Sequence, residues 1–411
     1  MKKYIFLTFT IDGVTGGQRY VNNKVKWLSE NGYDVIVFDH RGGLSLQGNV
    51  VLEYLKPYEN NRYLELFFPP SYFSEKQRTK FLDELCEKIG EAEDYVVESN
   101  SGRLSFWGEL LAQRLRAKHL YLDVGEHPDI RSITEYEYYA FKFDRNEFYL
   151  ISPKVTKTLF SGYRDISDQE AEDHVYAAIM NVVPEEVAMP EIEHLPQADY
   201  NILSFGRFKP YFDNMIDEVV KFAQVYKDKK INFVIMGVDK LQSKYIKQLN
   251  TCTNLYYQLI PLKYIIPKVI FRISDVVIAT AGCANISFDE GAKTISMNVE
   301  TNQPLGVMGY TTINSLVDAN QENNNEDLFT LLDNTLRKKM YEGPYTLIRP
   351  QWTNGYDFQV SLINDDRKYW PDVTKIKLDS SLRTLICKVL LRIKGIKIIA
   401  KIFNSKLGEL I

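Results

Sequence analysis

The sequence has few cysteines and no site motif built from them. The 411-residue chain contains four, Cys86, Cys252, Cys283 and Cys387, which are far apart and form no CxxC pair. This usage argues against a disulfide framework and a zinc site, and it is typical of a reducing compartment. No run of about 18 apolar residues occurs, which argues against an ordinary membrane-spanning helix. We therefore expect a cytoplasmic protein.

Several widespread nucleotide and metal motifs are also absent. The chain contains no GxGxxG, no GxxxxGK[ST] and no DxD. The first two absences argue against a dinucleotide-dependent dehydrogenase and a P-loop NTPase. His40, His119, His174 and His194 show no ligand-like spacing. We therefore expect no essential metal ion and no other cofactor. The net charge of −4 gives no overall attraction to nucleic acid, and we expect none as a partner.

The chain does contain an alternation of strand and helix patterns that occurs twice. Short apolar runs at 3–9 and 34–38 flank a helical pattern at 18–31, and Gly32 stands where a helix C-cap is expected. The same alternation starts again after a proline-rich, acidic stretch at 184–199. A chain of 411 residues exceeds what one hydrophobic core usually organises. We therefore predict an α/β protein with two Rossmann-like domains.

These patterns predict the following segments. They are an N-terminal domain over 1–183, a linker over 184–199, a second domain over 200–350, a return segment over 351–379 and a basic tail over 380–411. Further strands are predicted at 95–99, 119–124, 148–152, 201–206, 232–237, 254–258, 275–280 and 294–298, and further helices at 104–115, 213–226, 241–249, 262–272 and 288–292.

A glycine pair follows the first predicted strand. Gly16 and Gly17 lie in the loop that leads to the first helix. Backbone N–H groups at the start of a helix attract anions, and glycine permits a close approach of the ligand to the backbone. We expect a phosphate here, and the alternative is that the pair only makes a tight turn.

Two stretches of sequence resemble GT-B glycosyltransferases. They are GVTGGQRYVNNKVKWLSENGYDVIVF at 13–38 and SFGRFKP at 204–210. Both are similar to the large retaining group known as group 1 or family 4, which serves bacterial polysaccharide biosynthesis. The resemblance covers roughly residues 3–350. It implies two Rossmann-like domains that face each other across a cleft, with the acceptor bound in the first domain and the nucleotide sugar in the second.

The resemblance implies donor contacts where the second domain begins. Gly206 and Arg207 match a Gly-Arg pair at the end of a strand, and the family's arginine contacts the donor diphosphate. Five residues later the family usually has a lysine, whereas this chain has Phe212, and Lys209 is the nearby substitute. The alternative for Arg207 is a surface ion pair.

A second family landmark is ISDVVIATAGCANISFDEGAK at 273–293. Glu290 matches the glutamate that holds the ribose, and Gly282 stands where the family has another glutamate, eight residues earlier. We expect the loop from Gly282 to Asn285, with its backbone N–H groups and the Asn285 side chain, to hold phosphate instead. The alternative for Glu290 is an acid that is favoured by a helix dipole.

Acceptor chemistry is expected at the C-terminal edge of the first domain's sheet. The segment DVGEHPD at 123–129 follows a predicted strand and contains Glu126 and His127. We predict that His127 deprotonates or orients the acceptor hydroxyl, because imidazole titrates near neutral pH. Glu98, at the end of the preceding strand, is a weaker candidate. The alternative for His127 is a hydrogen-bonded loop residue.

Residues 380–403 carry basic residues and no acid. The basic residues are Arg383, Lys388, Arg392, Lys394, Lys397 and Lys401. Apolar residues recur between them at helical spacing, which predicts a basic amphipathic helical segment. We expect it to bind an anionic membrane surface, which places the protein peripherally on the inner face of the plasma membrane. The alternative is a helix that packs against the body of the protein or a partner.

Together these features predict a glycosyltransferase. Such an enzyme moves a sugar from a nucleotide-sugar donor to a glycan or lipid-linked acceptor, here in bacterial surface polysaccharide biosynthesis. A GT-B-like sugar-nucleotide epimerase or hydrolase would use the same donor site without an acceptor. A non-catalytic scaffold subunit with this fold is the third hypothesis, because Gly282 and Phe212 depart from the family pattern.

Overall fold

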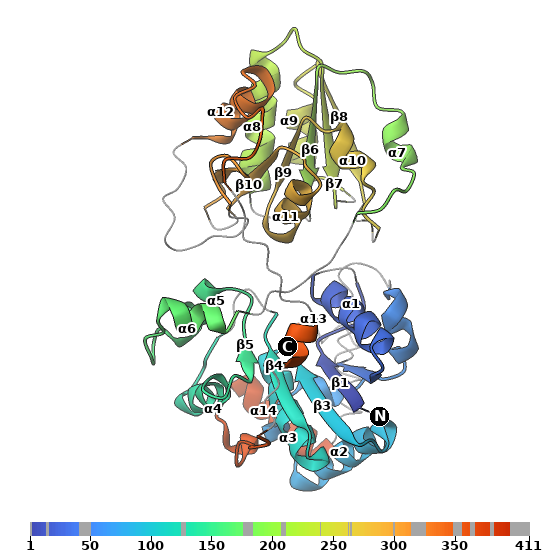
Figure 1. The fold of residues 1–411 in the computed structure, drawn as a ribbon, viewed down its shortest axis with the longest axis vertical. Coiled ribbons are helices and arrows are strands. Elements are labelled where there is room, and N and C mark those ends of the chain that lie inside the picture. Colours follow the sequence, from blue (N-terminus) through green and yellow to red (C-terminus); the bar gives the residue numbers. More distant parts are fainter. Residues whose placement is uncertain are drawn as a thin grey trace. The chain divides into compact units, whose positions relative to one another are not determined.

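The computed structural model contains two compact units. It describes residues 2–13, 16–40, 51–124, 129–175, 184–206, 211–238, 240–261, 263, 265–298, 301–313, 326–347, 356–361, 366–378 and 382–394. Unit 1 comprises Met1–Asn181 and Trp352–Ile411, and unit 2 comprises Val182–Gln351. The chain therefore leaves unit 1, forms unit 2 and returns to unit 1 (Figure 1).

Unit 1 is built on a parallel sheet of five strands in the order β2-β1-β3-β4-β5. The strands are β1 (Lys2–Thr8), β2 (Asp34–Asp39), β3 (Asp94–Ser99), β4 (Lys118–Leu122) and β5 (Phe148–Tyr149). In the register of the sheet, Tyr4 of β1 lies opposite Val35 of β2 and Val96 of β3. The apolar runs of β1 and β3 are buried on both faces, as expected for central strands of a parallel sheet.

Helices cover both faces of this sheet. They are α1 (Gly16–Glu30), α2 (Glu75–Ile89), α3 (Gly102–Leu115), α4 (Ile133–Phe143), α5 (Pro153–Phe160), α6 (Asp168–Asp173), α13 (Tyr356–Ser361) and α14 (Leu382–Lys394), with short 3-10 turns η1 (Glu53–Tyr58), η2 (Leu64–Phe67), η3 (Pro70–Tyr72) and η5 (Val373–Lys375). The predicted end of the first helix is confirmed, since Gly32 follows it with φ +80°, a left-handed conformation that favours glycine. Ser74 and Gln77 form a capping box at the start of α2.

Unit 2 repeats the same design on a sheet of six strands in the order β11-β10-β9-β6-β7-β8. The strands are β6 (Tyr200–Phe205), β7 (Ile231–Met236), β8 (Leu255–Ile260), β9 (Val276–Ala279), β10 (Thr294–Met297) and β11 (Pro304–Val307). All neighbours are parallel except β11, which is antiparallel to β10. The other elements are α7 (Pro190–Glu193), α8 (Phe212–Val225), α9 (Ser243–Leu249), α10 (Val269–Ile273), α11 (Ala281–Asp289), α12 (Leu328–Leu332) and the π-helical turn η4 (Asp333–Arg337).

Three sequence predictions for unit 2 need correction. The helix predicted over 288–292 lies earlier in the chain, as α11, so Gly282 to Asn285 form its first turns and not a loop, and Gly291 with φ +79° follows its end. The helix predicted over 262–272 begins only at Val269, because the backbone of Ile266 and Lys268 hydrogen-bonds Glu185 and Pro267 interrupts the pattern. The segment 184–199, predicted as an extended linker, includes the short helix α7 and belongs to unit 2. Ile192 of α7 is only 9% exposed and packs into the unit 2 core, which explains why this segment follows the unit's surface.

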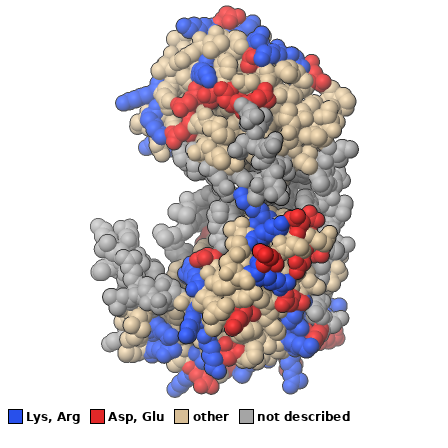
Figure 2. All heavy atoms as spheres, turned by 90° about the vertical axis from the view of Figure 1, so that its left-hand side faces the viewer, with Lys and Arg blue, Asp and Glu red and all other residues tan. Residues whose placement is uncertain are grey.

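Acidic and basic side chains are interspersed on the face of the molecule shown in Figure 2. Both signs occur close together on each unit in this view. This distribution agrees with the small net charge of −4.

Candidate functional site

The first candidate site lies at the carboxyl edge of the unit 2 sheet. Strands β6 and β9 are parallel neighbours, with Phe205 opposite Ala279 at their ends. Open parallel sheets bind ligands at this edge, where loops lead from strands into helices. Gly206 follows β6 with φ +140°, and Gly237 follows β7 with φ +108°. Glycine is therefore present at two strand ends where the backbone turns sharply.

The corner between β9 and α11 is strained. Ala281 has φ +51°, an uncommon left-handed conformation for a residue other than glycine. Thr280 precedes it at the N-cap position, yet its side chain makes no capping hydrogen bond. Its Oγ1 is buried and has no hydrogen-bond partner within the described residues. Because the first N–H groups of a helix also lack intrahelical partners, several donors converge at the start of α11.

A buried tyrosine hydroxyl lies beside this corner. Tyr211 is 0% exposed, and its OH has no hydrogen-bond partner in the part of the chain that the structure describes. A Cβ placed on Gly206 would lie 3.5 Å from Cys283 Sγ and 4.0 Å from the Tyr211 OH, so Gly206 brings the two segments together. Burial raises the pKa of Tyr211, with a smaller effect from Cys283, and the hydroxyl stays protonated as a hydrogen-bond donor.

The predicted donor residues within α11 lie at opposite ends of the helix. Gly282 is in its first turn, and Asn285 follows one turn later with a buried Oδ1 that has no partner among the described residues. Glu290 is the C-cap, and its carboxylate lies 3.7 Å from Lys268 Nζ. Eight residues of helix separate Gly282 from Glu290 by about 12 Å, so a ligand must extend along α11 to reach both.

Four of the predicted site residues lie outside the described residues. They are Arg207 and Lys209, which follow Gly206 in the sequence, and Glu126 and His127. Their predicted roles therefore stay predictions.

The second candidate site lies at the carboxyl edge of the unit 1 sheet. Gly16 and Gly17 were predicted to lie in the loop before the first helix, whereas the structure places both in the first turn of α1, which begins at Gly16. A Cβ placed on Gly17 would lie 3.7 Å from Val124 Cγ2, directly after β4. The structure therefore brings the glycine pair beside the segment that was predicted to serve the acceptor.

The loop after β1 is fixed by charged groups. Arg62 donates two hydrogen bonds of 2.7 Å to the carboxylate of Asp12, a bidentate pair. The Ile11 N–H donates to Asp39 Oδ2 at 3.1 Å, and Gln18 Nε2 donates to the Thr10 carbonyl at 3.2 Å. This part of the edge is therefore held in one conformation without a ligand.

His40 is a candidate that the sequence analysis missed. It follows β2, is 3% exposed, and neither ring nitrogen has a hydrogen-bond partner within the described residues. Its ring packs edge-on against the rings of Phe9 and Phe67, with distances of 4.0 Å and 5.3 Å between ring centroids. Burial lowers the pKa of His40 to about 4, with a smaller contribution from Arg103, so the imidazole is neutral at pH 7. Its place after a strand of the sheet was the only available sequence signal.

Glu98 has a structural role. Its carboxylate is 0% exposed and is 2.6 Å from Lys24 Nζ. Tyr4, Tyr20 and Asn100 donate further hydrogen bonds to it. Its oxygens are occupied by partners from unit 1 itself, which leaves no place for an acceptor hydroxyl.

Ser99, His119 and Glu109 form an arrangement that resembles a hydrolase triad. Ser99 Oγ is 3.0 Å from His119 Nε2, and His119 Nδ1 is 2.6 Å from Glu109 Oε2. All three side chains are at least 96% buried, and a Cβ on Gly108 would lie 2.1 Å from Ser99 Oγ. No substrate reaches a hydroxyl in this position, so this arrangement is part of the core.

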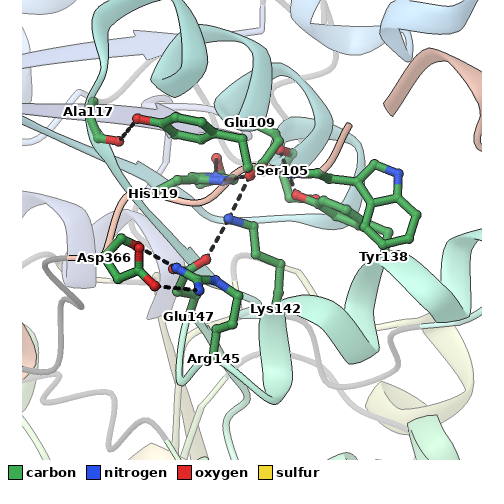
Figure 3. Close-up of polar contacts among 12 residues, drawn as sticks. Ser105, Glu109, Ala117, His119, Tyr138, Lys142, Arg145, Glu147 and Asp366 are labelled. Carbon is green, nitrogen blue, oxygen red and sulfur yellow. Dashed lines mark hydrogen bonds and ion pairs between the residues drawn. The ribbon is translucent and has the colours of Figure 1, made fainter. Parts of the chain in front are cut away.

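A buried polar cluster around Glu109, Lys142 and Glu147 attaches the C-terminal part of the chain, which returns from unit 2, to the rest of unit 1 (Figure 3). Lys142 Nζ lies 2.6 Å from Glu109 and 2.8 Å from Glu147. Burial by itself raises the pKa of Glu109, but Lys142 and His119 outweigh this effect and lower the pKa to about 2. The other Glu109 oxygen accepts a 2.6 Å hydrogen bond from the Trp370 N–H. The polar cluster thus fixes the segment 366–370.

The described residues contain neither a metal-binding cluster nor a helix that could span a membrane. No group of three or more His, Cys, Asp or Glu side chains there is arranged to hold a metal ion. Within those same ranges, no helix is both long enough and apolar enough to cross a membrane.

Comparison with known proteins gives similarity of fold only. No protein-family model matches the chain, and no curated protein matches it. A glycosyltransferase from Rickettsia africae is 15% identical over 72% of this chain and 80% of that chain, with a TM-score of 0.47. A UDP-GlcNAc 2-epimerase from Neisseria meningitidis, solved with UDP-GlcNAc bound, is 14% identical over 72% and 81%, with a TM-score of 0.40. Sucrose-phosphate synthase from Thermosynechococcus elongatus is 14% identical over 72% and 81%, with a TM-score of 0.43.

The fold class predicted from the sequence is confirmed. Two Rossmann-like units, each on a largely parallel sheet, and a C-terminal return to the first unit make an α/β protein with a GT-B-like fold. Glycosyltransferases and UDP-GlcNAc 2-epimerases both have this fold, so the fold alone does not distinguish them.

Proposed function

We propose that this protein is a glycosyltransferase that moves a sugar from a nucleotide-sugar donor to a glycan or lipid-linked acceptor. The observation that carries the proposal is the start of α11 in unit 2. There the strained Ala281, the buried Thr280 Oγ1 and the buried Tyr211 OH adjoin a helix N-terminus, and neither hydroxyl has a partner in the described chain. Buried polar groups are normally satisfied, so these groups support a bound ligand that accepts hydrogen bonds.

A diphosphate fits this set of donors. Helix N–H groups, hydroxyls and a helix dipole all favour an anion with several acceptor oxygens. In a transfer reaction, negative charge grows on the leaving diphosphate as the bond to the sugar breaks, and fixed donors stabilise that charge. Arg207 and Lys209 directly follow Gly206 in the sequence and supply the positive charge in this proposal. Glu290 takes the ribose, as the sequence resemblance implies.

The acceptor belongs to unit 1 in this proposal. His127, with Glu126 beside it, deprotonates or orients the acceptor hydroxyl. A neutral imidazole is suited to accept a proton from a hydroxyl group. The acceptor serves bacterial surface polysaccharide biosynthesis, and no metal ion takes part.

The first experiment is a thermal-shift screen of the full chain with UDP, GDP, CMP and their sugar conjugates. A ligand that binds only the folded protein raises its melting temperature. We expect one nucleoside diphosphate and its sugar conjugates to stabilise the protein. Thr280→Val should weaken this binding about tenfold, because it removes a hydrogen bond to a charged group. Ser204→Ala is the matched control, since it removes another buried hydroxyl without a partner among the described residues, from within β6.

The absence of a shift with every nucleotide would contradict the proposal and favour the scaffold hypothesis. Product analysis with the bound nucleotide sugar separates the two enzyme classes. An epimerase or hydrolase converts the sugar without an acceptor, whereas a transferase releases nucleoside diphosphate in proportion to glycosylated acceptor. In that assay, His127→Gln should lower the rate of transfer and leave nucleotide binding unchanged.

A further inference from the structure

Helix α14 is docked on unit 1 by one of its faces. Leu391 is fully buried in the core cluster that α2 and α3 share, and Leu390 packs against the same cluster. The Leu391 carbonyl accepts a 2.9 Å hydrogen bond from Gln77 Nε2, and an Arg392 N–H donates to the Ser71 carbonyl at 3.2 Å. One face of α14, the inner face, therefore packs against unit 1, as the alternative stated for this segment in the sequence analysis requires.

The opposite face of α14 is apolar and exposed. Leu385 is 57% exposed, Ile386 49%, Val389 45% and Ile393 72%. Their spacing of three and four residues places them on one continuous stripe of the helix. This stripe, the outer face of α14, accounts for four of the large hydrophobic residues that are exposed in the described chain. Exposed apolar side chains that gather on one helix face indicate an interaction surface.

A basic stripe separates the inner face from the outer face. Lys388 and Arg392 are four residues apart and lie on the same side of α14. Within the described residues no ion pair joins Lys388 to an acid, and Arg392 is bonded only to a backbone carbonyl. The order around the helix is therefore buried apolar, basic and exposed apolar, which is the order of an interfacial helix whose cations lie at the level of lipid headgroups.

A pocket of about 340 Å³ opens beside this stripe. It is lined by Ser71, Phe73, Ser74, Glu75, Arg78, Thr374, Lys388 and Arg392. Three of these side chains are cationic and one, Glu75, is acidic. The pocket thus has an excess of positive charge directly beside an exposed apolar surface.

The charges around Arg78 show that the cations are close together. The pKa of Arg78 is lowered, mainly by burial. The carboxylates of Asp372 and Glu75 raise this pKa, and the positive charge of Arg392 lowers it further. Asp372 is itself engaged, since it accepts hydrogen bonds from Thr374 and lies 3.5 Å from Lys375 Nζ. An anion in the pocket would relieve the repulsion between Arg78 and Arg392.

We propose that the outer face of α14 and the basic pocket beside it dock on a membrane surface, with the phosphate of an anionic lipid headgroup in the pocket. The apolar stripe enters the acyl boundary, and Lys388, Arg392 and Arg78 contact headgroup phosphates. A second copy of the chain fits this surface less well, because an antiparallel two-fold pairing of outer faces brings two basic stripes of equal sign together. The inference is independent of the proposed function and uses no nucleotide-site residue.

The test is co-sedimentation of the full chain with vesicles. One set contains phosphatidylcholine alone, and the other contains equal amounts of phosphatidylcholine and phosphatidylglycerol. We expect the protein to sediment with the anionic vesicles and to be released by added salt. Lys388→Glu should weaken this binding about tenfold, since each basic residue near the surface contributes substantially to the attraction. Ile393→Ser should weaken binding through lost apolar contact, because Ile393 is exposed and its replacement leaves the core intact.

Two variants in unit 2 serve as matched controls. Lys247→Glu makes the same charge change at an exposed lysine of α9, and Val225→Ser makes the same loss of apolar surface at a residue that is 56% exposed. Both should bind vesicles as the unchanged protein does. Equal binding to neutral and anionic vesicles, or equal effects of test and control variants, would overturn the proposal.

Two further measurements exclude other occupants. If inorganic phosphate raises the melting temperature in a way that Lys388→Glu abolishes, while vesicles do not bind, the pocket takes a soluble phosphate compound and the lipid proposal is wrong. If the protein sediments as a dimer that Ile393→Ser converts to a monomer, the outer face is a subunit interface and the proposal is equally wrong.

Discussion

Lys24 Nζ and Glu98 Oε2 form an ion pair of 2.6 Å in unit 1, and both side chains are 0% exposed. Tyr20 bridges the pair, since its OH accepts from Lys24 at 2.9 Å and donates to Glu98 at 2.8 Å. Burial lowers the pKa of Lys24, and Glu98 acts in the opposite direction. The two charges join α1 to β3 in the middle of the sheet.

Removing one member of this pair should be strongly destabilising. We expect Lys24→Met to lower the free energy of unfolding by about 3–5 kcal/mol, because the Glu98 carboxylate is left buried without a counter-ion. The double variant Lys24→Met, Glu98→Leu should lose clearly less, since it buries no unpaired charge. Urea unfolding followed by circular dichroism measures both. A double variant as unstable as the sum of the two single variants would show that the charges are independent.

Stability should fall when the pH is lowered from about 7.5 to 5.5. Burial lowers the pKa of His40 to about 4, and burial also lowers the pKa values of His119 and His174. Below pH 6.5 these histidines take up protons in the unfolded chain before they do so in the folded protein, so protonation favours unfolding. His40 should contribute about 1 kcal/mol over this interval, and His119 and His174 act in the same direction. Urea unfolding at the two pH values is the measurement.

The control for this prediction is an exposed histidine. His40→Gln should reduce the pH dependence between 7.5 and 5.5, and His194→Gln should leave it unchanged. Glu109 acts in a lower window, because its folded pKa of about 2 lies below the ordinary value of 4.5. Its stabilising contribution is present above pH 4.5 and is lost as the pH falls toward 2. An unchanged free energy of unfolding from pH 7.5 to 5.5 would contradict the neutral, buried histidines.

Glycine substitutions at two positions of α11 should have opposite effects. Ala281→Gly should stabilise the protein by up to about 1 kcal/mol, because the left-handed φ of +51° strains alanine and not glycine. Ala284→Gly should destabilise it by about 1 kcal/mol or more, since Ala284 is buried within the helix. Differential scanning calorimetry shows the two directions as shifts of melting temperature. A loss of stability in both variants would show that the corner at Ala281 is not strained.

Gly108 should tolerate no side chain. A Cβ there would lie 2.1 Å from Ser99 Oγ and 2.5 Å from His119 Nε2, both in the rigid core. We expect Gly108→Ala to destabilise unit 1 by about 1–3 kcal/mol through overpacking. Gly162→Ala is the control, because a Cβ at Gly162 meets nothing within 4 Å. Thermal unfolding of the two variants should therefore differ, and equal melting temperatures would contradict the close packing around His119.

The elements that the sequence predicted are those with a local physical signal. Apolar runs predicted the strands of both sheets except β11, and Gly32 predicted the end of α1, because each depends on residues that are neighbours in the chain. Strand β11 has only four residues and begins at a proline, so it has no comparable run. The amphipathic pattern at 380–403 predicted a helical segment, and the structure contains α14 over Leu382–Lys394, with the rest of the pattern outside the described residues. Which face of α14 docks depends on Gln77 and its surroundings, more than 300 residues away in the sequence, and no local pattern contains that information.

The candidate site was predicted only in part for the same reason. Gly282 and Asn285 were expected to hold phosphate from a loop, whereas the structure places both in α11. The structure adds Thr280 and Tyr211, because their buried hydroxyls have no hydrogen-bond partner among the described residues. The Glu109 to Trp370 hydrogen bond joins residues 261 positions apart, so the spacing of charged residues gave no sign of it. His40 was missed because a single histidine after a strand has no motif around it.

The return of the chain to unit 1 has a consequence for synthesis on the ribosome. Tyr356, Val373, Ile376 and Leu391 each belong to a hydrophobic cluster of unit 1. Unit 2 consists of the contiguous residues Val182–Gln351, so all of its chain is made before these four residues and leaves the ribosome before they do. The nascent protein can complete its second unit while its first unit still has apolar surface uncovered, so the order of folding runs against the order of translation.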